Sequence, residues 1–308
     1  MSTLRFHLFG KFSVRRDAEA VKGLDAGKEQ ELLSYLLIHR DRNHSRETLA
    51  SLLWGDSSTE RSKKYLRQAL WHLVMALQEG SDTHSGPLEV EHDWVRLSPR
   101  GSFWLDVAAF EDAVRATQGV PGKQLDAERA TLLKQAVEFY QGDLLEGWYD
   151  DWCIFERERL QNIYLLILDK LISYCATHRD YEGGQSYGYT ILRYDRARER
   201  THRQLMHLKY MAGDRTGALR QYDRCAAALK EELGVQPERR TLVLYEQIRA
   251  DKLSDAELVG ESPTATAAVS LPAVLGRLKR LQLVLGAAQK RIQRDIKAVE
   301  MGLKSSKQ

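Results

Sequence analysis

The chain has 308 residues, of which 43% are hydrophobic and 29% are charged. This length leaves room for two domains, and the composition excludes intrinsic disorder, collagen-like repeats and low-complexity sequence for most of the chain. The net charge of +3 is too small to indicate a partner by itself, although residues 271–308 hold nine basic and two acidic residues.

Neither a membrane segment nor a disulfide framework is expected. Arg5 and Lys11 interrupt the N-terminal apolar run, and no later stretch approaches about 18 uncharged apolar residues. The cysteines Cys153, Cys175 and Cys225 are widely spaced and form no CxxC pair, a pattern that favours neither disulfides nor zinc. We therefore expect a cytoplasmic protein that has no contact with a membrane.

The first residues predict a small sheet followed by two helices. The opening LRFHLFGKFSV alternates around Gly10 and predicts two short strands, with Val21–Leu24 as a possible third. Apolar residues at helical spacing then predict a helix over residues 28–39. Ser45 is a suitable cap for a second helix, RETLASLLW.

A third helix and a β-hairpin complete the N-terminal pattern. The helix begins within DSSTERSK and extends to about Leu77, before the helix breakers Gly80, Ser81 and Asp82. In PLEVEHDWVRLSP, alternating residues flank a turn at His92–Asp93 and predict a hairpin. The order of small sheet, three helices and hairpin predicts a winged helix-turn-helix of the OmpR type over residues 1–100.

The third helix is the candidate reading helix. Leu66, Leu70, Leu73 and Leu77 form one apolar stripe that we expect to be buried. On the opposite face and its flanks lie basic, amide and large apolar side chains: Arg61, Lys63, Lys64, Arg67, Gln68, Trp71, His72 and Met75. A solvated charged face is the simplest explanation, but the order of elements around the helix favours DNA recognition.

The residue types on this face suit the major groove of double-stranded DNA. Arg or Lys can bind guanine and Gln68 can bind adenine. Phosphate contacts would come from Arg46, from Arg61 and Lys63 in the first turn, and from Arg96 in the hairpin. The predicted DNA-binding residues are Arg46, Arg61, Lys63, Lys64, Arg67, Gln68, Trp71 and Arg96.

Several segments, taken in chain order, resemble a known family. Residues 105–114 (LDVAAFEDAV), 132–147 (LLKQAVEFYQGDLLEG), 150–171 and 203–248 look like the bacterial transcriptional activator domain. With the N-terminal LFGKFSV, SRETLASLLW and RSKKYLRQALWHL, residues 1 to about 250 are similar to the antibiotic regulatory protein family. The resemblance implies a transcription activator with a winged helix that binds direct repeats and a tetratricopeptide-like domain that helps to place RNA polymerase.

Two positions depart from the family pattern. The family commonly has Arg where this chain has Val74, and a small or polar residue where it has Trp71. The family pattern therefore supports DNA contacts of this helix only as far as Gln68. Trp71 could contact DNA, pack against the hairpin or lie against the helical domain, and we favour the helical domain because Val74 and Met75 extend the same apolar patch.

The middle of the chain predicts stacked helical pairs. DYEGG at residues 180–184 and DRTGA at residues 214–218 are 34 residues apart, the tetratricopeptide period. Ala218 and Tyr222 supply the small and aromatic residues that closely packed antiparallel helices need. We expect a mainly α protein with an all-α tetratricopeptide-like domain over residues 101–253.

The sequence gives little indication of catalysis or metal binding. It lacks GxxxxGK[ST], GxGxxG after a strand and HExxH, so we expect neither an enzyme nor a cofactor. His39 and His44 favour an ordinary surface pair over a metal site. The acidic residues Asp150, Asp151, Glu156 and Glu158 alternate with aromatic and arginine residues, which is more typical of a salt-bridged helix start.

The C-terminal part is set apart by composition. Residues 254–270 are rich in small residues and predict a linker. In residues 271–308, Leu271, Leu278, Leu285, Ile292 and Val299 follow a heptad spacing. This pattern predicts an amphipathic helix that either docks on its own protein or forms a homotypic coiled coil, with membrane-surface binding less favoured.

The sequence therefore favours a DNA-binding transcription regulator, most readily an activator. Its expected partners are double-stranded DNA, RNA polymerase and further copies of the chain, associated through the C-terminal helix or on DNA. The alternative is a helical interaction scaffold whose winged helix does not read DNA, an alternative that the lost charge at Val74 supports.

Overall fold

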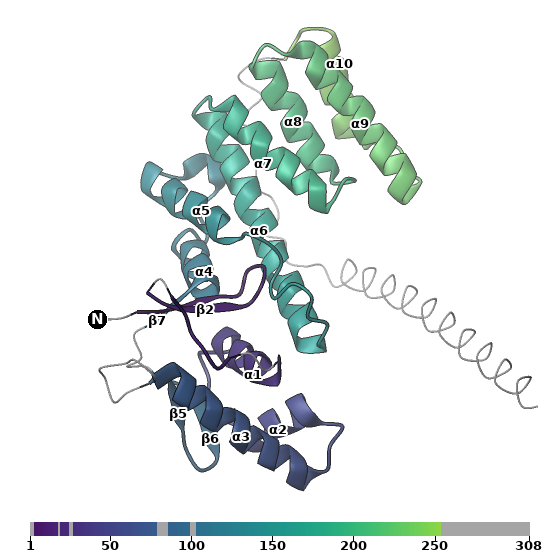
Figure 1. Ribbon diagram of the computed structural model, residues 1–308. Helices are drawn as coiled ribbons and strands as arrows, with labels where there is room; N and C mark the ends of the chain where they lie inside the picture. Colours follow the sequence, from purple (N-terminus) through teal and green to yellow (C-terminus); the bar gives the residue numbers. More distant parts are fainter. Residues whose placement is uncertain (1–2, 18, 25–26, 79–85, 99–102, 254–308) are drawn as a thin grey trace, which may run out of the picture. The chain divides into compact units, whose positions relative to one another are not determined.

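We analysed a computed structural model that describes residues 3–17, 19–24, 27–78, 86–98 and 103–253 (Figure 1). Residues Met1–Leu253 form one compact unit. The predicted linker at residues 254–270 and the amphipathic helix at residues 271–308 lie outside the described residues. The described fold is mainly helical with small N-terminal sheets, which confirms the predicted fold class for this part of the chain.

A four-stranded sheet joins the start of the chain to the residues after the hairpin. Its order is β3 (Glu19–Ala20), β2 (Ser13–Arg16), β1 (Leu4–His7) and β7 (Phe103–Leu105). The β1–β2 and β2–β3 pairs are antiparallel, whereas β1 and β7 are parallel. Because β7 follows the predicted boundary at residue 100, the two expected domains share this sheet.

The predicted third strand is displaced. The strand is β3 at Glu19–Ala20 and not Val21–Leu24, because the chain turns directly after β2. Asp17 has a φ of 54°, and Arg16 then pairs with Glu19. Leu24 is buried outside the sheet and contributes to the core.

The three helices of the winged helix follow the sheet, at the ranges the sequence predicts to within a few residues. They are α1 (Gly27–Ile38), α2 (Arg46–Trp54) and α3 (Thr59–Gln78). Ser45 occupies the N-cap position of α2, but its side chain makes no capping hydrogen bond. It belongs instead to a short strand, β4 (His44–Ser45), that the sequence did not predict.

The hairpin forms the wing. Strands β5 (Leu88–Val90) and β6 (Trp94–Leu97) are antiparallel, and β4 pairs with the other edge of β6 to give the order β4-β6-β5. The backbone N–H of Arg46 also donates to the carbonyl of Asp93 at 3.0 Å. The start of α2 is therefore fixed to the tip of the wing.

The rest of the described chain is helical. It consists of α4 (Asp106–Ala116), the 3-10 turn η1 (Gly122–Gln124), α5 (Ala127–Phe139), α6 (Asp151–Thr177), α7 (Tyr181–Tyr194), α8 (Glu199–Met211), α9 (Arg215–Leu233) and α10 (Arg239–Arg249). No helix among the described residues is both long and apolar enough to span a bilayer.

The 34-residue repeat predicted from the sequence corresponds to two equivalent helix starts. Asp180 caps α7 by accepting from the N–H of Gly183, and Asp214 caps α9 by accepting from the N–H of Gly217. Helix α7 packs closely on α8, because a Cβ on Gly188 would lie 2.6 Å from Leu205 Cδ2. This close antiparallel packing is typical of tetratricopeptide-like pairs.

Candidate nucleic-acid interface

Helix α3 presents two chemically distinct faces. Leu66, Leu70, Leu73 and Leu77 are almost completely buried in the main core, as their spacing predicts. Arg61, Lys63, Lys64, Arg67, Gln68, Trp71 and Met75 are exposed. The apolar stripe thus fixes the helix on the core and turns the basic and amide side chains to the solvent.

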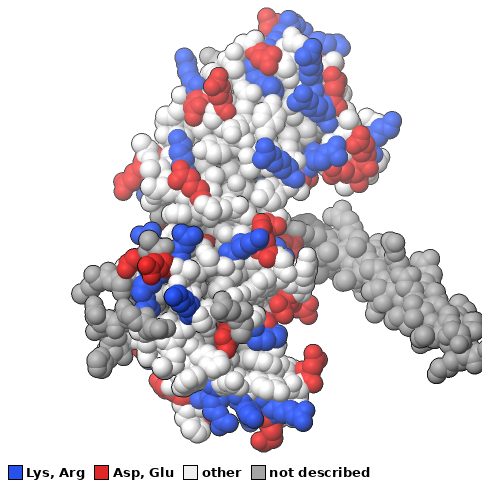
Figure 2. Space-filling view, viewed as in Figure 1, with Lys and Arg blue, Asp and Glu red and all other residues white. Residues whose placement is uncertain are grey.

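Basic side chains gather at the winged-helix end of the described chain. Figure 2 shows a group of Lys and Arg side chains at the bottom of the view, where Figure 1 places α2 and α3. One of the charges is paired across the turn, since Lys63 Nζ lies 3.3 Å from Glu47 Oε1 of α2. Both side chains are more than half exposed, so this ion pair is weak and can be exchanged for a phosphate contact.

His72 departs from the expected exposed face. Its Nδ1 lies 2.5 Å from Oε1 of Glu29, which is nearly buried on α1. On a helical wheel His72 lies on the same face as Trp71 and is expected to be exposed. The wheel describes one helix alone and so does not reveal that α1 packs beside His72. His72 therefore ties α3 to α1, and the exposed face narrows to the remaining residues.

Two predicted phosphate-binding residues are already engaged within the protein. Arg46 Nη1 donates to the carbonyl of Glu91 in the wing at 3.2 Å. Arg96 Nε donates to Oε2 of Glu89 on the neighbouring strand at 2.6 Å, and Ser98 Oγ donates to the other oxygen of the same carboxylate. These contacts organise the wing and neutralise part of its charge.

The wing also carries an exposed aromatic residue that the sequence analysis did not select. Trp94 is 48% exposed and directly follows the turn at His92–Asp93. Successive residues of a strand point to opposite faces, and Val95, the next residue, is fully buried. The alternating sequence pattern could therefore have indicated that Trp94 is exposed. Trp94 thus adds an aromatic side chain to the wing in addition to its charges.

Trp71 is the largest exposed side chain of α3. It is 61% exposed and its ring lies against that of His72, with 5.1 Å between the ring centroids. Met75, one turn further along, is also exposed. The expectation that Trp71 is buried against the helical domain is therefore wrong for the described residues, and an aromatic side chain remains in line with Lys64, Arg67 and Gln68.

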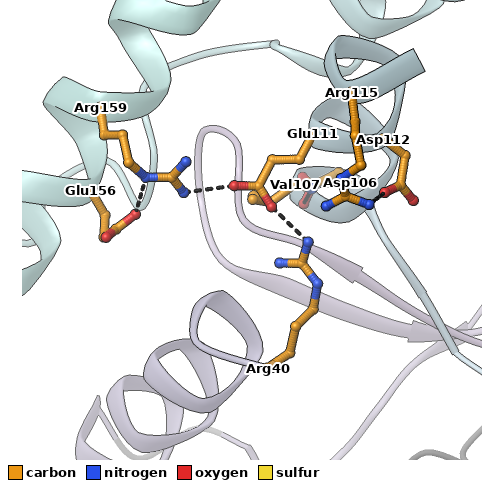
Figure 3. Close-up of polar contacts among 8 residues, drawn as sticks. All are labelled: Arg40, Asp106, Val107, Glu111, Asp112, Arg115, Glu156 and Arg159. Carbon is orange, nitrogen blue, oxygen red and sulfur yellow. Dashed lines mark hydrogen bonds and ion pairs between the residues drawn. The ribbon is translucent and has the colours of Figure 1, made fainter. Parts of the chain in front are cut away.

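The contact between the winged helix and the later helices lies elsewhere, at the end of α1. Glu111 of α4 accepts from Arg40 at 2.6 Å and from Arg159 of α6 at 2.7 Å, and Arg159 also pairs with Glu156 (Figure 3). Burial raises the pKa of Glu111, but the bonds from the two arginines outweigh it and hold the pKa below the usual value.

An aromatic contact accompanies this ion-pair network. The rings of Tyr35 on α1 and Trp152 on α6 meet edge to face, with centroids 5.4 Å apart. Arg157 donates to the carbonyls of Leu144, Leu145 and Trp148 and so holds the residues that lead into α6. The start of α6 is thus a structural junction, and Glu156, one of the four acidic residues in the predicted salt-bridged start, pairs with Arg159.

The other residues considered for chemistry have structural partners. His44 is buried, and its Nε2 lies 3.0 Å from the carbonyl of His39, so the expectation of a surface pair is wrong for His44. Burial lowers the pKa of both imidazoles. The described residues contain no group of three or more His, Cys, Asp or Glu side chains that could hold a metal ion.

The cysteines are also structural in their surroundings. Cys153, Cys175 and Cys225 are free and buried. Burial raises the pKa of the Cys153 thiol to about 11 and that of Cys225 to about 12. Thiols of this kind remain protonated and are poor nucleophiles near neutral pH.

Comparison with known proteins agrees with this arrangement. Residues 105–249 match the family model of the bacterial transcriptional activator domain. The regulatory protein AfsR of Streptomyces coelicolor is 24% identical over 273 residues, which cover 88% of this chain and 27% of that protein. The chain therefore spans about a quarter of the length of this relative.

A solved structure shares the fold. EmbR of Mycobacterium tuberculosis, determined in complex with a low-affinity phosphopeptide, superposes with a TM-score of 0.68 at 20% sequence identity. The match covers 83% of this chain and 68% of that one. Residues 105–249 of the chain therefore form a bacterial transcriptional activator domain, and the chain is similar in sequence to AfsR and in fold to EmbR.

Proposed function

We propose that the protein is a sequence-specific DNA-binding transcription regulator and that α3 enters the major groove. The observation that carries this proposal is the division of α3 into a buried leucine stripe and an exposed face bearing Lys64, Arg67 and Gln68. A helix of this kind, followed by a β-hairpin, is the reading element of winged-helix proteins.

Each exposed side chain has a role suited to its chemistry. Gln68 can make two hydrogen bonds to adenine, and Arg67 or Lys64 can donate to guanine or to a flanking phosphate. Arg61 and Lys63, in the first turns of α3, are placed for backbone phosphates, where a helix N-terminus also favours anions. Arg46 and Arg96 can reach phosphate only by sharing the contacts that they make within the wing.

RNA polymerase is the second partner that we propose. The match to the bacterial transcriptional activator domain and the name of the Streptomyces relative support a regulator. Contact with the polymerase is what the resemblance to the antibiotic regulatory protein family implies. We propose activation as the direction of regulation on the basis of the family.

The test is a titration of the protein with DNA from its own upstream region at increasing salt. Binding by phosphate contacts should weaken linearly on a plot of log affinity against log salt. Lys64→Ala and Arg67→Ala should each weaken binding about tenfold, and loss of a phosphate contact should reduce the salt slope by about one. Arg220→Ala, an exposed arginine on α9, serves as the matched control.

The alternative is an interaction scaffold whose winged helix does not read DNA. The exposure of Trp71 and Met75 on α3 favours it, because large apolar side chains are enriched in protein interfaces. A scaffold would show no salt-dependent affinity for the upstream DNA. Equal affinities for wild type, Lys64→Ala and Arg67→Ala would remove α3 from the reading role.

A further inference from the structure

Helix α10 is the last described helix and buries only one of its faces. Thr241 and Ile248 are buried against α8 and α9, and Tyr245 stacks on Tyr222 of α9 with ring centroids 4.3 Å apart. The opposite face has no such cover among the described residues, since Leu242 is 45% exposed and Val243 is 46% exposed.

This outer face forms a shallow apolar groove. Its volume is about 400 Å³, and it is lined by Arg239, Leu242, Val243, Glu246, Gln247, Ala250 and Lys252. Stacks of helical repeats usually end in a helix whose outer face is polar, because that face meets water. Two adjacent aliphatic residues at the centre of the outer face of α10 do not fit a solvent-facing cap.

The charges around the apolar pair are arranged symmetrically. Arg239 and Glu246 are seven residues apart, which is about two helical turns, so they lie on one line along the helix. The midpoint between them falls between Leu242 and Val243. A helix of this pattern is complementary to a copy of itself that runs in the opposite direction.

We propose that α10 is a homotypic interface that pairs with α10 of a second copy about a two-fold axis. In this antiparallel arrangement Arg239 of each copy meets Glu246 of the other, and Leu242 of each meets Val243 of the other. An isologous interface uses the same patch on both subunits, so one self-complementary face is sufficient. Burial of the four aliphatic side chains supplies the driving force and the two ion pairs fix the direction.

The existing partners of these residues permit this pairing. Glu246 pairs with Arg249 at 2.8 Å within the same helix, but both side chains are about half exposed. An exposed pair of this spacing contributes little to stability, so the carboxylate can also accept from Arg239 of the second copy. Arg249 keeps a second contact over the ring of Tyr245, at 5.8 Å from the ring centroid.

The position of Val243 next to the proposed axis gives a specific test. The mass of the full chain is measured by sedimentation equilibrium in the absence of DNA, so the result does not depend on the proposed function. In Val243→Glu and in Val243→Lys, like charges meet near the axis, and self-association should weaken about 10- to 100-fold. A mixture of the two variants should regain association, because opposite charges then meet.

Exchange of the flanking charges provides an independent check. Arg239→Glu alone and Glu246→Arg alone should weaken association, and the double variant should restore it. Leu166→Glu, on an exposed site of α6, is the control and should leave association unchanged. A monomeric wild type, association that survives Val243→Glu, or a mixture that fails to associate would each overturn the proposal.

Discussion

Asp106 is the residue that joins the N-terminal strand to the first helix of the activator domain. It is 2% exposed at the start of α4, where its Oδ2 accepts from the backbone N–H groups of Leu8 and Phe9 at 2.8 and 2.9 Å. Its Oδ1 accepts from the N–H of Val107 at 2.7 Å. One carboxylate thus satisfies donors that are nearly 100 residues apart in the sequence.

Removal of this carboxylate should destabilise the described unit. Asp106→Ala leaves the buried N–H groups of Leu8 and Phe9 without their acceptor, and we expect a loss of about 1 to 3 kcal/mol in the free energy of unfolding. Urea denaturation at pH 7.5 measures this loss. Asp112→Ala, an exposed position on the same helix, is the control and should change stability by less than about 0.5 kcal/mol.

The pH dependence provides a second measurement at the same residue. Burial raises the pKa of Asp106 to about 6. The folded state therefore binds a proton more tightly than the unfolded state, and the stability that this group contributes is present below about pH 4 and is lost as the pH rises through about 6. Asp106→Asn should lack this decrease. Parallel stability curves for the two proteins between pH 4 and 7 would contradict the raised pKa.

At the scale of the element, helices and strands with a strong periodic pattern could be predicted from the sequence, whereas the shortest strands could not. The leucine stripe of α3 and the β5–β6 hairpin lie where their patterns place them. Strands β3 and β4 have two residues each and β7 has three, which is too short for an alternating pattern to show. They form because pairing with longer strands fixes them, and that pairing depends on tertiary structure.

In the candidate nucleic-acid interface, some features could likewise be predicted from the sequence and others could not. The exposure of Lys64, Arg67 and Gln68 follows from helical geometry and a known buried stripe. The pairing of His72 with Glu29 and the salt bridge from Arg96 to Glu89 do not, because each depends on a neighbouring element. Exposure on a single helix is predictable from sequence, whereas partners between elements require the fold.

Trp71 gives the test for the reading helix as an element. Since its side chain is mostly exposed, Trp71→Ala should change the free energy of unfolding by less than about 0.5 kcal/mol. If α3 occupies the major groove, the indole contacts DNA, and its loss should reduce DNA affinity about tenfold. Fluorescence anisotropy with labelled upstream DNA measures the affinity, and thermal denaturation measures the stability.

An exposed aromatic residue outside the winged helix is the control for Trp71. It tests whether the loss of any exposed aromatic side chain reduces DNA affinity. Tyr149 is 79% exposed just before α6, outside the winged helix, and Tyr149→Ala should leave DNA affinity unchanged. An unchanged or increased affinity for Trp71→Ala would contradict a contact between the indole and DNA.

At the scale of the whole molecule, the winged helix is connected to the activator domain through side chains as well as through the shared sheet. Helix α1 contacts α6 through Tyr35 and Trp152, and Arg40 after α1 contacts α4 through Glu111. The sequence alone predicted an acidic and aromatic start for α6 but gave no sign of its partner. Contacts between residues so far apart in sequence depend on the relative placement of elements, which local patterns do not encode.

Glu111 tests whether this junction contributes to the stability of the unit. Its carboxylate is 17% exposed and bonds to Arg40, which is 14% exposed, and to the more exposed Arg159. Glu111→Gln leaves the largely buried guanidinium of Arg40 without a counter-charge, at a cost of about 2 kcal/mol in the free energy of unfolding. Glu156→Gln is the control, because that carboxylate pairs only with Arg159 of its own helix in the salt bridges described, and its loss should cost less.

The effect of Glu111 should also depend on pH in a defined direction. Burial raises its pKa, but bonds from Arg40 and Arg159 bring the pKa below the ordinary value of 4.5, so the pair stabilises the fold above about pH 4.5 and loses this contribution as the pH falls through the lowered pKa. The difference in stability between wild type and Glu111→Gln should therefore be constant from pH 6 to 8 and diminish below pH 4.5. A difference that remains unchanged in acid would show that Glu111 acts through packing rather than through its charge, and the junction would then rest on the contact between Tyr35 and Trp152.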